Sequence, residues 1–410
     1  MTTTSWANFF HIYQPPNWDK KIIQKVVRES YHPLFQALKN RPRIKLTLNI
    51  CGSLTEQLER LGFSSVLNTI KGLAENGQIE FTGSAKYHPI LPLLSSYEME
   101  RQIQLNYDTN RRFFGSAYQP KGFFMPEMCY SQAVAKTVKK LGYEWILLDE
   151  ISYNGNLGEV KFNAGYKTLS GSLKVIFRNR FISDMFFMDI LKNTRSFYEA
   201  LKKDPRAASV LITGFDGENL GHHNPHLLRI WLELVESKRF TNLKLSDVLA
   251  SYRHWKEVAP VPASWASRQS ELRGNHPYYL WNDRHNPIHQ LQWKLTKLVY
   301  ESIKSLPVSN RRYSRARDLL DQALASDQYW WAAASPWWSR EIVDRGADKL
   351  LQALQIGLPK SKATLSAKKI HDQIIALVDK WQTTGTAEQK KYTYLSAEPF
   401  TRYFGGRKVT

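Results

Sequence analysis

Two carboxylates in this chain stand directly after apolar runs with the composition of buried strands. Residues 210–212 (VLI) lead through Gly214 to Asp216, and residues 122–125 (GFFM) lead through a proline to Glu127. The carboxyl ends of parallel strands meet at one edge, where α/β barrels carry their chemistry. We therefore predict that Glu127 and Asp216 face each other across one cleft. A carboxylate nucleophile and a proton-donating carboxylic acid form the pair that cleavage of a glycosidic bond requires.

Histidines gather near the same strand ends, at His11, His88, His222 and His223. Imidazoles with a nearby aspartate are also common metal ligands, so a metal-dependent polysaccharide deacetylase is the alternative. Two histidine pairs have the four-residue spacing of such ligands, but each contains a proline: His222/His226 around Pro225, and His285/His289 around Pro287. The Asp-Asp pair of deacetylases is also missing near the first strand. We therefore predict that these histidines form hydrogen bonds with sugar hydroxyl groups. We expect no metal and no organic cofactor.

Trp265 and Trp281 lie on loop-like sequence near proline and glycine, whereas the tryptophans at 330–331 fall in a helical pattern and fit helix packing. Flat indole rings suit the apolar faces of sugars, so we predict that Trp265 and Trp281 are substrate platforms. Cys129 lies close to the first carboxylate, and a Cys–His nucleophile with His222 is conceivable. The sequence offers no residue to orient such a pair, and we expect Cys129 to be a packing residue.

The elements that must position these side chains alternate between strands and helices. This alternation predicts parallel pairing with right-handed crossovers. Because the strands repeatedly end in polar or aromatic clusters, an α/β barrel, incomplete, is favoured over a flat sheet. The predicted strands are residues 5–10, 44–50, 79–82, 122–127, 145–148 and 209–213, with a hairpin at residues 166–178.

The hydrophobic pattern of the sequence changes after His223, where helical periodicity predominates. We expect a catalytic (β/α) barrel domain at residues 1–241 and an α-helical C-terminal domain at residues 242–410 that completes the cleft. The predicted helices after the barrel are residues 226–237, 245–255, 292–304, 314–325, 340–354 and 364–382.

Four ordered motifs resemble glycoside hydrolase family 57, the retaining family of α-amylases, 4-α-glucanotransferases, branching enzymes and amylopullulanases. They are HIYQP at 11–15, GQIEF at 77–81 with YHPIL at 87–91, PEMCY at 126–130 and DGENLG at 216–221. The resemblance implies an incomplete (β/α)7 barrel followed by a C-terminal α-helical domain. It also implies an α-glucan or maltooligosaccharide substrate, with Glu127 as nucleophile and Asp216 as general acid/base.

Substrate-binding positions follow from these motifs and from the aromatic residues. They are His11, Tyr13, Gln14, Tyr87, His88, Glu218, His222, His223, Trp265 and Trp281. Four positions depart from the usual family pattern, because Tyr13 replaces a second histidine, His88 a glutamate, Met128 an arginine and His223 a tryptophan. Both carboxylates are intact, so the reaction class is retained while the linkage and chain length of the substrate stay open. A non-catalytic glucan-binding protein on this scaffold is a further alternative.

The composition of the chain limits which partners and which cellular location are expected. The net charge of +20 requires a nucleic-acid partner to be weighed, but the basic residues are spread over the whole chain and no nucleic-acid motif occurs. Two cysteines give no disulfide framework. The sequence has no apolar run of the ~20 residues that span a membrane, and no signal peptide is recognised at its start. We therefore expect a cytoplasmic protein without a membrane or specific nucleic-acid partner.

Overall fold

The computed structural model describes residues 3–16, 18–169, 171, 173–187 and 190–397. The chain divides into two compact units, Met1–Pro277 and Tyr278–Thr410. This division lies later than the predicted boundary after residue 241. The reason is that two short strands beyond that residue pair with strands of the first unit, β9 with β1 and β10 with β6.

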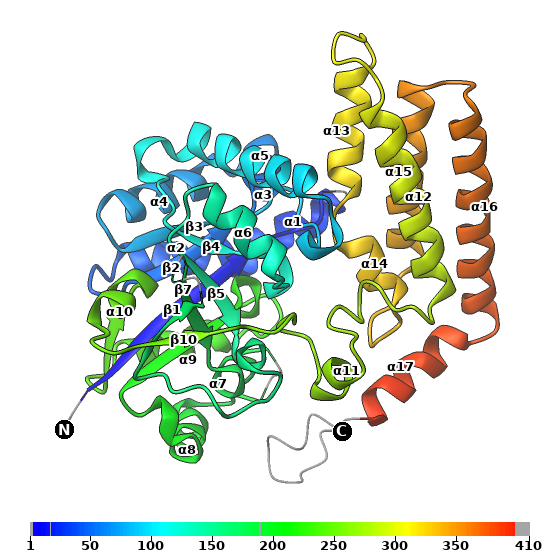
Figure 1. Ribbon diagram of the computed structural model, residues 1–410. Helices are drawn as coiled ribbons and strands as arrows, with labels where there is room; N and C mark the ends of the chain where they lie inside the picture. Colours follow the sequence, from blue (N-terminus) through cyan, green and yellow to red (C-terminus); the bar gives the residue numbers. More distant parts are fainter. Residues whose placement is uncertain (1–2, 17, 170, 172, 188–189, 398–410) are drawn as a thin grey trace. The chain divides into compact units, whose positions relative to one another are not determined.

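The first unit is built on one curled sheet in the order β10-β6-β7-β5-β4-β3-β2-β1-β8, with β9 beside β1 (Figure 1). All pairs are parallel except β6–β7, which is antiparallel. The order runs from β10 to β8 without joining these two ends, so the predicted incomplete barrel is confirmed. The strands are β1 (Thr4–Ile12), β2 (Leu46–Ile50), β3 (Ile79–Gly83), β4 (Gly122–Phe124), β5 (Trp145–Asp149), β6 (Gly165–Thr168), β7 (Lys174–Arg178), β8 (Val210–Asp216), β9 (Phe240–Leu243) and β10 (Trp255–Val258).

Strand β1 lies at the centre of the core because both of its faces are covered. Seven of its nine residues, from Trp6 to Ile12, are buried, as the near-continuous apolar sequence of a parallel strand requires. Its register places His11 beside Asn49 of β2 on one side and beside Asp216 of β8 on the other. The pairing of β1 thus brings a predicted substrate ligand next to a predicted catalytic carboxylate.

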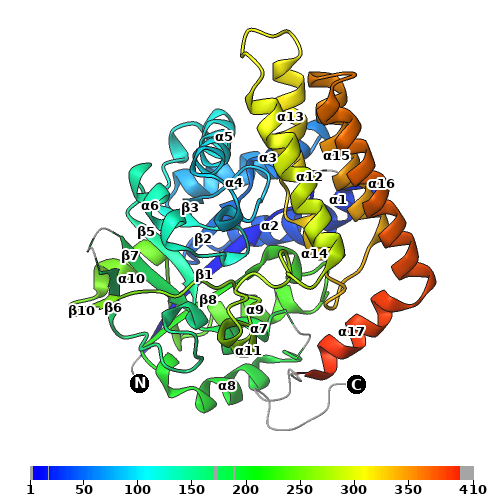
Figure 2. The same ribbon diagram turned by 45° about the vertical axis from the view of Figure 1, so that its right-hand side comes forward.

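Helices pack around this sheet (Figure 2). The predicted helix at residues 245–255 is shorter in the structure, because Trp255 starts the edge strand β10. The helices of the first unit are α1 (Lys20–Val26), α2 (His32–Lys39), α3 (Gly52–Arg60), α4 (Ser64–Glu75), α5 (Ser96–Phe114), α6 (Gln132–Lys140), α7 (Arg180–Asp184), α8 (Thr194–Lys203), α9 (Leu227–Val235), α10 (Leu245–Ser251) and α11 (Gln269–Arg273), with a π-helical turn η1 (Val27–Tyr31) and short 3-10 turns that include η4 (Pro126–Met128) and η7 (Gly217–Asn219).

The second unit is α-helical, as the sequence predicts. Asn286 caps the first helix by accepting from the backbone N–H groups of Ile288 and His289, with proline at the first helical position. Four long helices lie side by side in both ribbon views (Figures 1 and 2). No helix of the described part of the chain is both long and apolar enough to cross a membrane. The helices are α12 (Pro287–Lys304), α13 (Tyr313–Ala323), α14 (Asp327–Ala332), α15 (Arg340–Gly357), α16 (Lys362–Thr383) and α17 (Thr386–Ala397).

Candidate active site

Glu127 sits in a strained turn immediately after strand β4. Its backbone lies in the left-handed region (φ 58°, ψ 18°), and the next residue, Met128, follows with φ 50°. His88, after strand β3, also has a positive φ of 57°. This conformation costs free energy for residues other than glycine, and residues that adopt it concentrate at functional sites. The turn therefore holds the Glu127 carboxylate in a specific direction instead of letting the chain relax.

Trp265 contacts Glu127 through both its side chain and its backbone. The indole Nε1–H donates to Glu127 Oε2 at 2.6 Å, and the Trp265 backbone N–H donates to the Glu127 carbonyl oxygen at 3.1 Å. The guanidinium of Arg178 lies 5.4 Å from the centroid of the Trp265 ring, in a cation–π contact. The sequence predicts a sugar platform at Trp265, and the structure gives it a further role as a hydrogen-bond donor to the carboxylate.

Three rings from two strand ends stack next to Glu127. The Tyr13 ring lies 4.2 Å from the His88 ring, and the His11 ring lies 4.9 Å from it on nearly parallel planes. His88 Nδ1 approaches Glu127 Oε1 to 3.8 Å, which is longer than a hydrogen bond. His11 also lies edge-on to the Trp265 ring at 6.2 Å. The structure thus brings these predicted residues into one group around Glu127.

His11 is held as a neutral ring with a defined tautomer. Its Nδ1 lies 2.8 Å from Asn49 Oδ1, while the amide nitrogen of Asn49 donates to Thr82 Oγ1. Because Asn49 offers an acceptor to the ring, Nδ1 carries the proton and Nε2 presents a lone pair. Burial lowers the pKa of His11 to about 4, against the opposing effect of the Asn49 hydrogen bond. Nε2 of His11 is buried and has no hydrogen-bond partner among the described residues, as expected of an acceptor for a substrate hydroxyl.

His88 is likewise held in its uncharged form. Burial, and then the neighbouring His11 ring, lower the pKa of His88 well below its usual value. Two neutral imidazoles beside Glu127 act as polar, hydrogen-bonding surfaces and add no positive charge to the site.

Asp216 ends strand β8 opposite His11 in the register of the sheet. Burial raises the pKa of Asp216 from 3.8 to about 7, and the positive charge of Arg178 opposes this rise. The carboxyl group is therefore largely protonated in the slightly acidic range, in the direction predicted for a general acid. The Arg178 guanidinium thus acts on Asp216 and also lies over the Trp265 ring, whose indole N–H bonds Glu127.

Glu218 lies two residues further on, in the turn η7, and is held by two side chains from near the amino terminus. Gln14 Nε2 donates to Glu218 Oε1 at 3.2 Å, and Tyr31 OH donates to Glu218 Oε2 at 3.2 Å. Burial, and then the charge of Asp216, raise the pKa of Glu218 well above its usual range. The predicted residues Gln14 and Glu218 therefore form one network beside Asp216.

His222 and His223 form a separate pair. His222 Nδ1 lies 2.6 Å from Glu29 Oε2, and the two imidazole rings are 4.9 Å apart. Gly221 makes this approach possible, because its φ is +122° and a Cβ there would lie 2.1 Å from the Glu29 carbonyl oxygen. The His222 ring is therefore fixed against the helical turn that carries Glu29, while His223 is exposed.

Tyr87 and Trp281, two further predicted substrate contacts, are buried as well. Tyr87 is 6% exposed, under the ammonium group of Lys86 at 5.2 Å from the ring centroid. Trp281 belongs to the second unit, where its side chain is 1% exposed and its carbonyl oxygen accepts from the Trp293 indole N–H. The structure does not present Trp281 as an exposed platform, because its ring is packed as a core side chain.

The alternatives involving metal and thiol chemistry find little support in these contacts. Both ring nitrogens of His289 are in use, since Nδ1 accepts from the Asp283 backbone and Nε2 donates to the Tyr329 carbonyl oxygen. Within the described ranges, no group of three or more His, Cys, Asp or Glu side chains could hold a metal ion. Cys129 is fully buried, and burial raises the pKa of its thiol well above the usual value. A protonated, enclosed thiol is a poor nucleophile.

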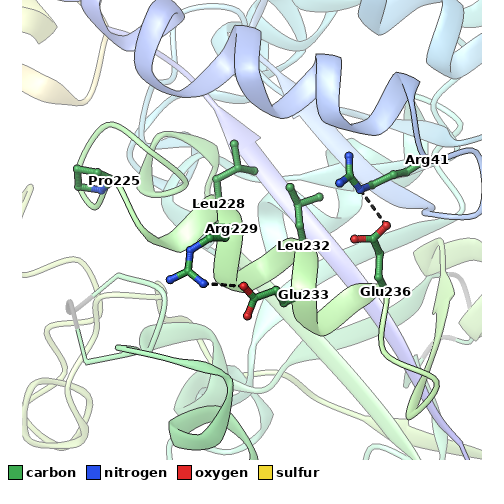
Figure 3. Close-up of a pocket in the computed structure, with 7 residues that line it drawn as sticks. All are labelled: Arg41, Pro225, Leu228, Arg229, Leu232, Glu233 and Glu236. Atoms are coloured by element: carbon green, nitrogen blue, oxygen red, sulfur yellow. Dashed lines mark hydrogen bonds and ion pairs between the residues drawn. The ribbon is translucent and has the colours of Figure 1, made fainter.

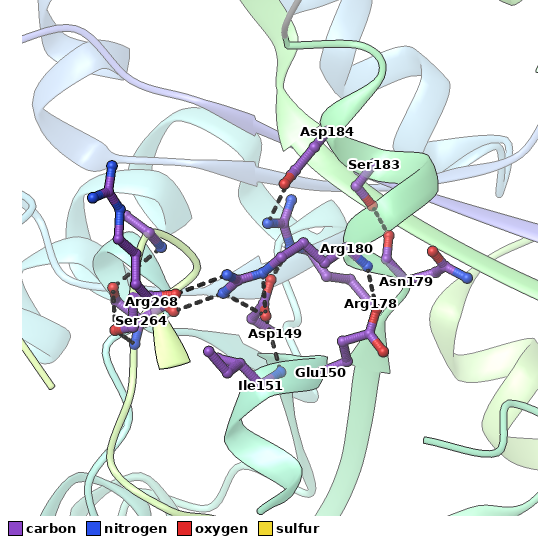
Figure 4. Close-up of polar contacts among 12 residues, drawn as sticks. Asp149, Glu150, Ile151, Arg178, Asn179, Arg180, Ser183, Asp184, Ser264 and Arg268 are labelled. Carbon is purple, nitrogen blue, oxygen red and sulfur yellow. Dashed lines mark hydrogen bonds and ion pairs between the residues drawn. The ribbon is translucent and has the colours of Figure 1, made fainter. Parts of the chain in front are cut away.

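The prediction from sequence misses a buried charge network at the ends of β5 and β7 (Figure 4). Asp149, which is 0% exposed, accepts from Arg178 Nε at 2.6 Å and from Arg180 Nε at 2.8 Å. Arg178 also donates to Asp184 Oδ1 at 3.1 Å and to the Gly214 carbonyl oxygen at 2.7 Å. The sequence contained a signal for this network, because Arg178 and Arg180 come at the end of an apolar strand, as Asp216 does.

A shallow pocket on the outer side of α9 lies apart from these residues (Figure 3). Ion pairs between Arg229 and Glu233 and between Arg41 and Glu236 border Leu228 and Leu232 there. None of the predicted site residues lines this pocket, so it is not the candidate active site. Its complete lining is Arg41, Pro225, Leu228, Arg229, Leu232, Glu233 and Glu236.

Comparison with known proteins identifies the family and the fold. The model of glycosyl hydrolase family 57 matches residues 6–259. An alpha-amylase of Pyrococcus horikoshii is 26% identical over 167 residues, which are 40% of this chain and 26% of that relative. The match covers less than half the length of each curated relative.

Two solved structures share the fold of this chain. The 4-alpha-glucanotransferase of Thermococcus litoralis superposes with a TM-score of 0.69 at 17% identity, covering 87% of this chain and 60% of that one. The branching enzyme of Pyrococcus horikoshii superposes with a TM-score of 0.66 at 15% identity, covering 90% of this chain and 94% of that one.

Proposed function

Because the chain belongs to glycosyl hydrolase family 57, we propose that it cleaves or transfers α-linked glucosyl units with retention of the anomeric configuration. The substrate is an α-glucan or a maltooligosaccharide. Glu127 is the nucleophile and Asp216 is the general acid/base. Curated relatives of the chain carry the names alpha-amylase and 4-alpha-glucanotransferase, which supports this class of substrate.

The proposed reaction has two displacements. In the first, a Glu127 carboxylate oxygen bonds to the anomeric carbon while the bond from that carbon to the glycosidic oxygen breaks, and Asp216 gives its proton to the departing oxygen. In the second, Asp216 takes a proton from water or from a sugar hydroxyl. The oxygen so activated bonds to the anomeric carbon, and Glu127 leaves as a carboxylate. Water as acceptor gives hydrolysis, and a sugar acceptor gives transfer.

The observation that carries the proposal is the difference between the environments of the two carboxyl groups. Glu127 accepts the Trp265 indole N–H at 2.6 Å, a contact that favours the carboxylate form. Burial raises the pKa of Asp216 to about 7, which favours the protonated form. One ionised and one protonated carboxyl group are the starting state that a retaining glycosidase needs.

Uncharged polar groups supply the proposed sugar contacts. His11 Nε2 is an acceptor for a hydroxyl group, and the ring stack formed with Tyr13 and His88 offers further polar edges. Gln14 and Glu218, together with His222 and His223, lie on the turns after β1 and β8. Tyr13, His88 and His223 differ from the usual family pattern and are the places where linkage and chain length would be selected.

The deciding experiment is early-time product analysis on amylose, maltooligosaccharides and pullulan, combined with proton NMR of the first anomeric signal. Release of the α anomer supports the proposal, and initial release of the β anomer refutes it. A retaining pair also requires a carboxyl separation of about 5–5.5 Å in the substrate complex. Glu127→Gln is the control for contaminating activity. Binding of these glucans without turnover would instead identify a non-catalytic glucan-binding protein.

A further inference from the structure

The turn that carries Trp265 is closed by its own serines. Ser264 N–H donates to Ser267 Oγ at 2.8 Å, and the two hydroxyl groups lie 3.0 Å apart. Ahead of the turn, the Ala263 carbonyl oxygen accepts from the Tyr130 backbone N–H at 2.8 Å. The Ser267 backbone N–H donates to the Ser264 carbonyl oxygen at 3.2 Å, and the carbonyl oxygens of residues 264 and 267 each also accept from a side chain outside the turn.

Arg180 binds both of these carbonyl oxygens. Its Nη1 donates to Ser267 O at 2.8 Å and its Nη2 to Ser264 O at 3.2 Å, so the two contacts lie on either side of Trp265. The same guanidinium also bonds Asp149, through Nε at 2.8 Å and through Nη2 at 2.7 Å, and Arg178 bonds this carboxylate as well (Figure 4). The guanidinium is planar and rigid, and here it links the end of β5 to the turn that carries Trp265.

We propose that Arg180 is a positioning residue that clamps this turn so that the Trp265 indole N–H stays on Glu127 Oε2. The inference rests on the proposed role of Glu127. It adds a residue outside the reacting groups, because Arg180 is proposed to act on Glu127 through Trp265. Arg178 contributes from the other side, since its guanidinium lies over the indole ring while Asp149 holds both arginines.

Lysine cannot replace this arginine in the clamp. Its single ammonium group can keep the ion pair with Asp149, but it cannot bond two carbonyl groups and the carboxylate in the planar geometry of a guanidinium. Arg180→Lys therefore separates charge from clamping, and Arg180→Met removes both. Phenylalanine at position 265 removes the indole N–H itself, and with it the contact through which Arg180 is proposed to act.

The test uses the full chain labelled with ¹⁵N in its tryptophan indoles, with the Trp265 resonance assigned by its loss in Trp265→Phe. In the wild type we expect this resonance to titrate with Glu127, and the titration to be absent from Glu127→Gln. In Arg180→Lys and Arg180→Met we expect the resonance to shift upfield and its titration to weaken. The kcat on the glucan substrate should fall about tenfold with KM nearly unchanged.

Arg206→Met is the matched control. Arg206 is a part-buried arginine that bonds Glu150 and Asp204 at 2.6 Å and therefore belongs to the neighbouring network. We expect it to leave the Trp265 resonance in place. In the Trp265→Phe background, Arg180→Lys should cost less than twofold in kcat, because the contact it protects is already gone.

An unshifted Trp265 resonance in folded Arg180→Lys would overturn the proposal. Equal losses of kcat in the wild-type and Trp265→Phe backgrounds would overturn it as well, because they would show that Arg180 acts by another route. Thermal unfolding of each variant identifies those that are folded. If the wild type turns over no glucan, the proposed function fails, and the indole resonance still decides whether Arg180 positions Trp265.

Discussion

The hydrogen bond between the Trp265 indole and Glu127 gives a quantitative prediction for Trp265→Phe. The substitution keeps an aromatic ring but removes the donor that lies 2.6 Å from Glu127 Oε2. Hydrogen bonds to charged groups contribute about 1.5–3 kcal/mol, which corresponds to about 10- to 150-fold in a rate constant.

The two displacements should not suffer equally from this change. In the resting enzyme the hydrogen bond from Trp265 stabilises the Glu127 carboxylate. Loss of this bond raises the free energy of the starting state, which partly offsets the slowing of the first displacement. In the glycosyl-enzyme of the proposed mechanism, Glu127 is a neutral ester, and the hydrogen bond from Trp265 regains its strength only as the carboxylate leaves. We therefore expect the second displacement to slow by about tenfold or more, with the glycosyl-enzyme accumulating.

The assay is rapid-quench kinetics on an aryl maltooligosaccharide, with mass spectrometry of the intact protein to detect the glycosyl adduct. Trp338→Phe is the control for loss of an indole N–H, because Trp338 loses a bond to the neutral amide oxygen Gln382 Oε1 at 2.8 Å in the second unit. A Trp265→Phe enzyme with wild-type kcat and no adduct would refute the reasoning. Equal losses in both variants would point to general destabilisation instead.

Four further predictions follow from the same contacts. Glu127→Gln should lower kcat by several orders of magnitude while glucan binding and the thermal unfolding transition stay near wild type; activity within about tenfold of wild type would exclude Glu127 as the nucleophile. Because Asp216 must be protonated in the first step and burial raises its pKa to about 7, kcat/KM should fall about tenfold per pH unit above that value, and a profile flat to pH ~9 would contradict this. Cys129→Ser should retain activity, as measured by initial rates, because the thiol is buried and protonated. Dialysis against a strong chelator should leave the rate unchanged, whereas a loss restored by a divalent metal would favour the deacetylase alternative.

Much of the fold could be predicted because local signals and packing agree. Buried parallel strands tend to be continuous apolar runs, so β5 and β8 are visible as short hydrophobic segments, whereas β2 is visible from its alternation of apolar and polar residues. The edge strands β9 and β10 could not be predicted in this way. They are short and partly exposed, and their pairing with β1 and β6 depends on partners far away in the sequence.

The sequence by itself determined the fold class, the family and the two carboxylates at strand ends, because residue type, strand length and motif order are local properties. Only the tertiary structure decided what surrounds those carboxylates. Burial and Arg178 govern the protonation of Asp216, the 2.6 Å contact joins Trp265 to Glu127, and Arg180 reaches the turn from 84 residues away in the chain. Trp281 is also a tryptophan on loop-like sequence, yet it is packed in the core. Hydrogen bonds and desolvation depend on distance in space, and separation along the sequence does not encode that distance.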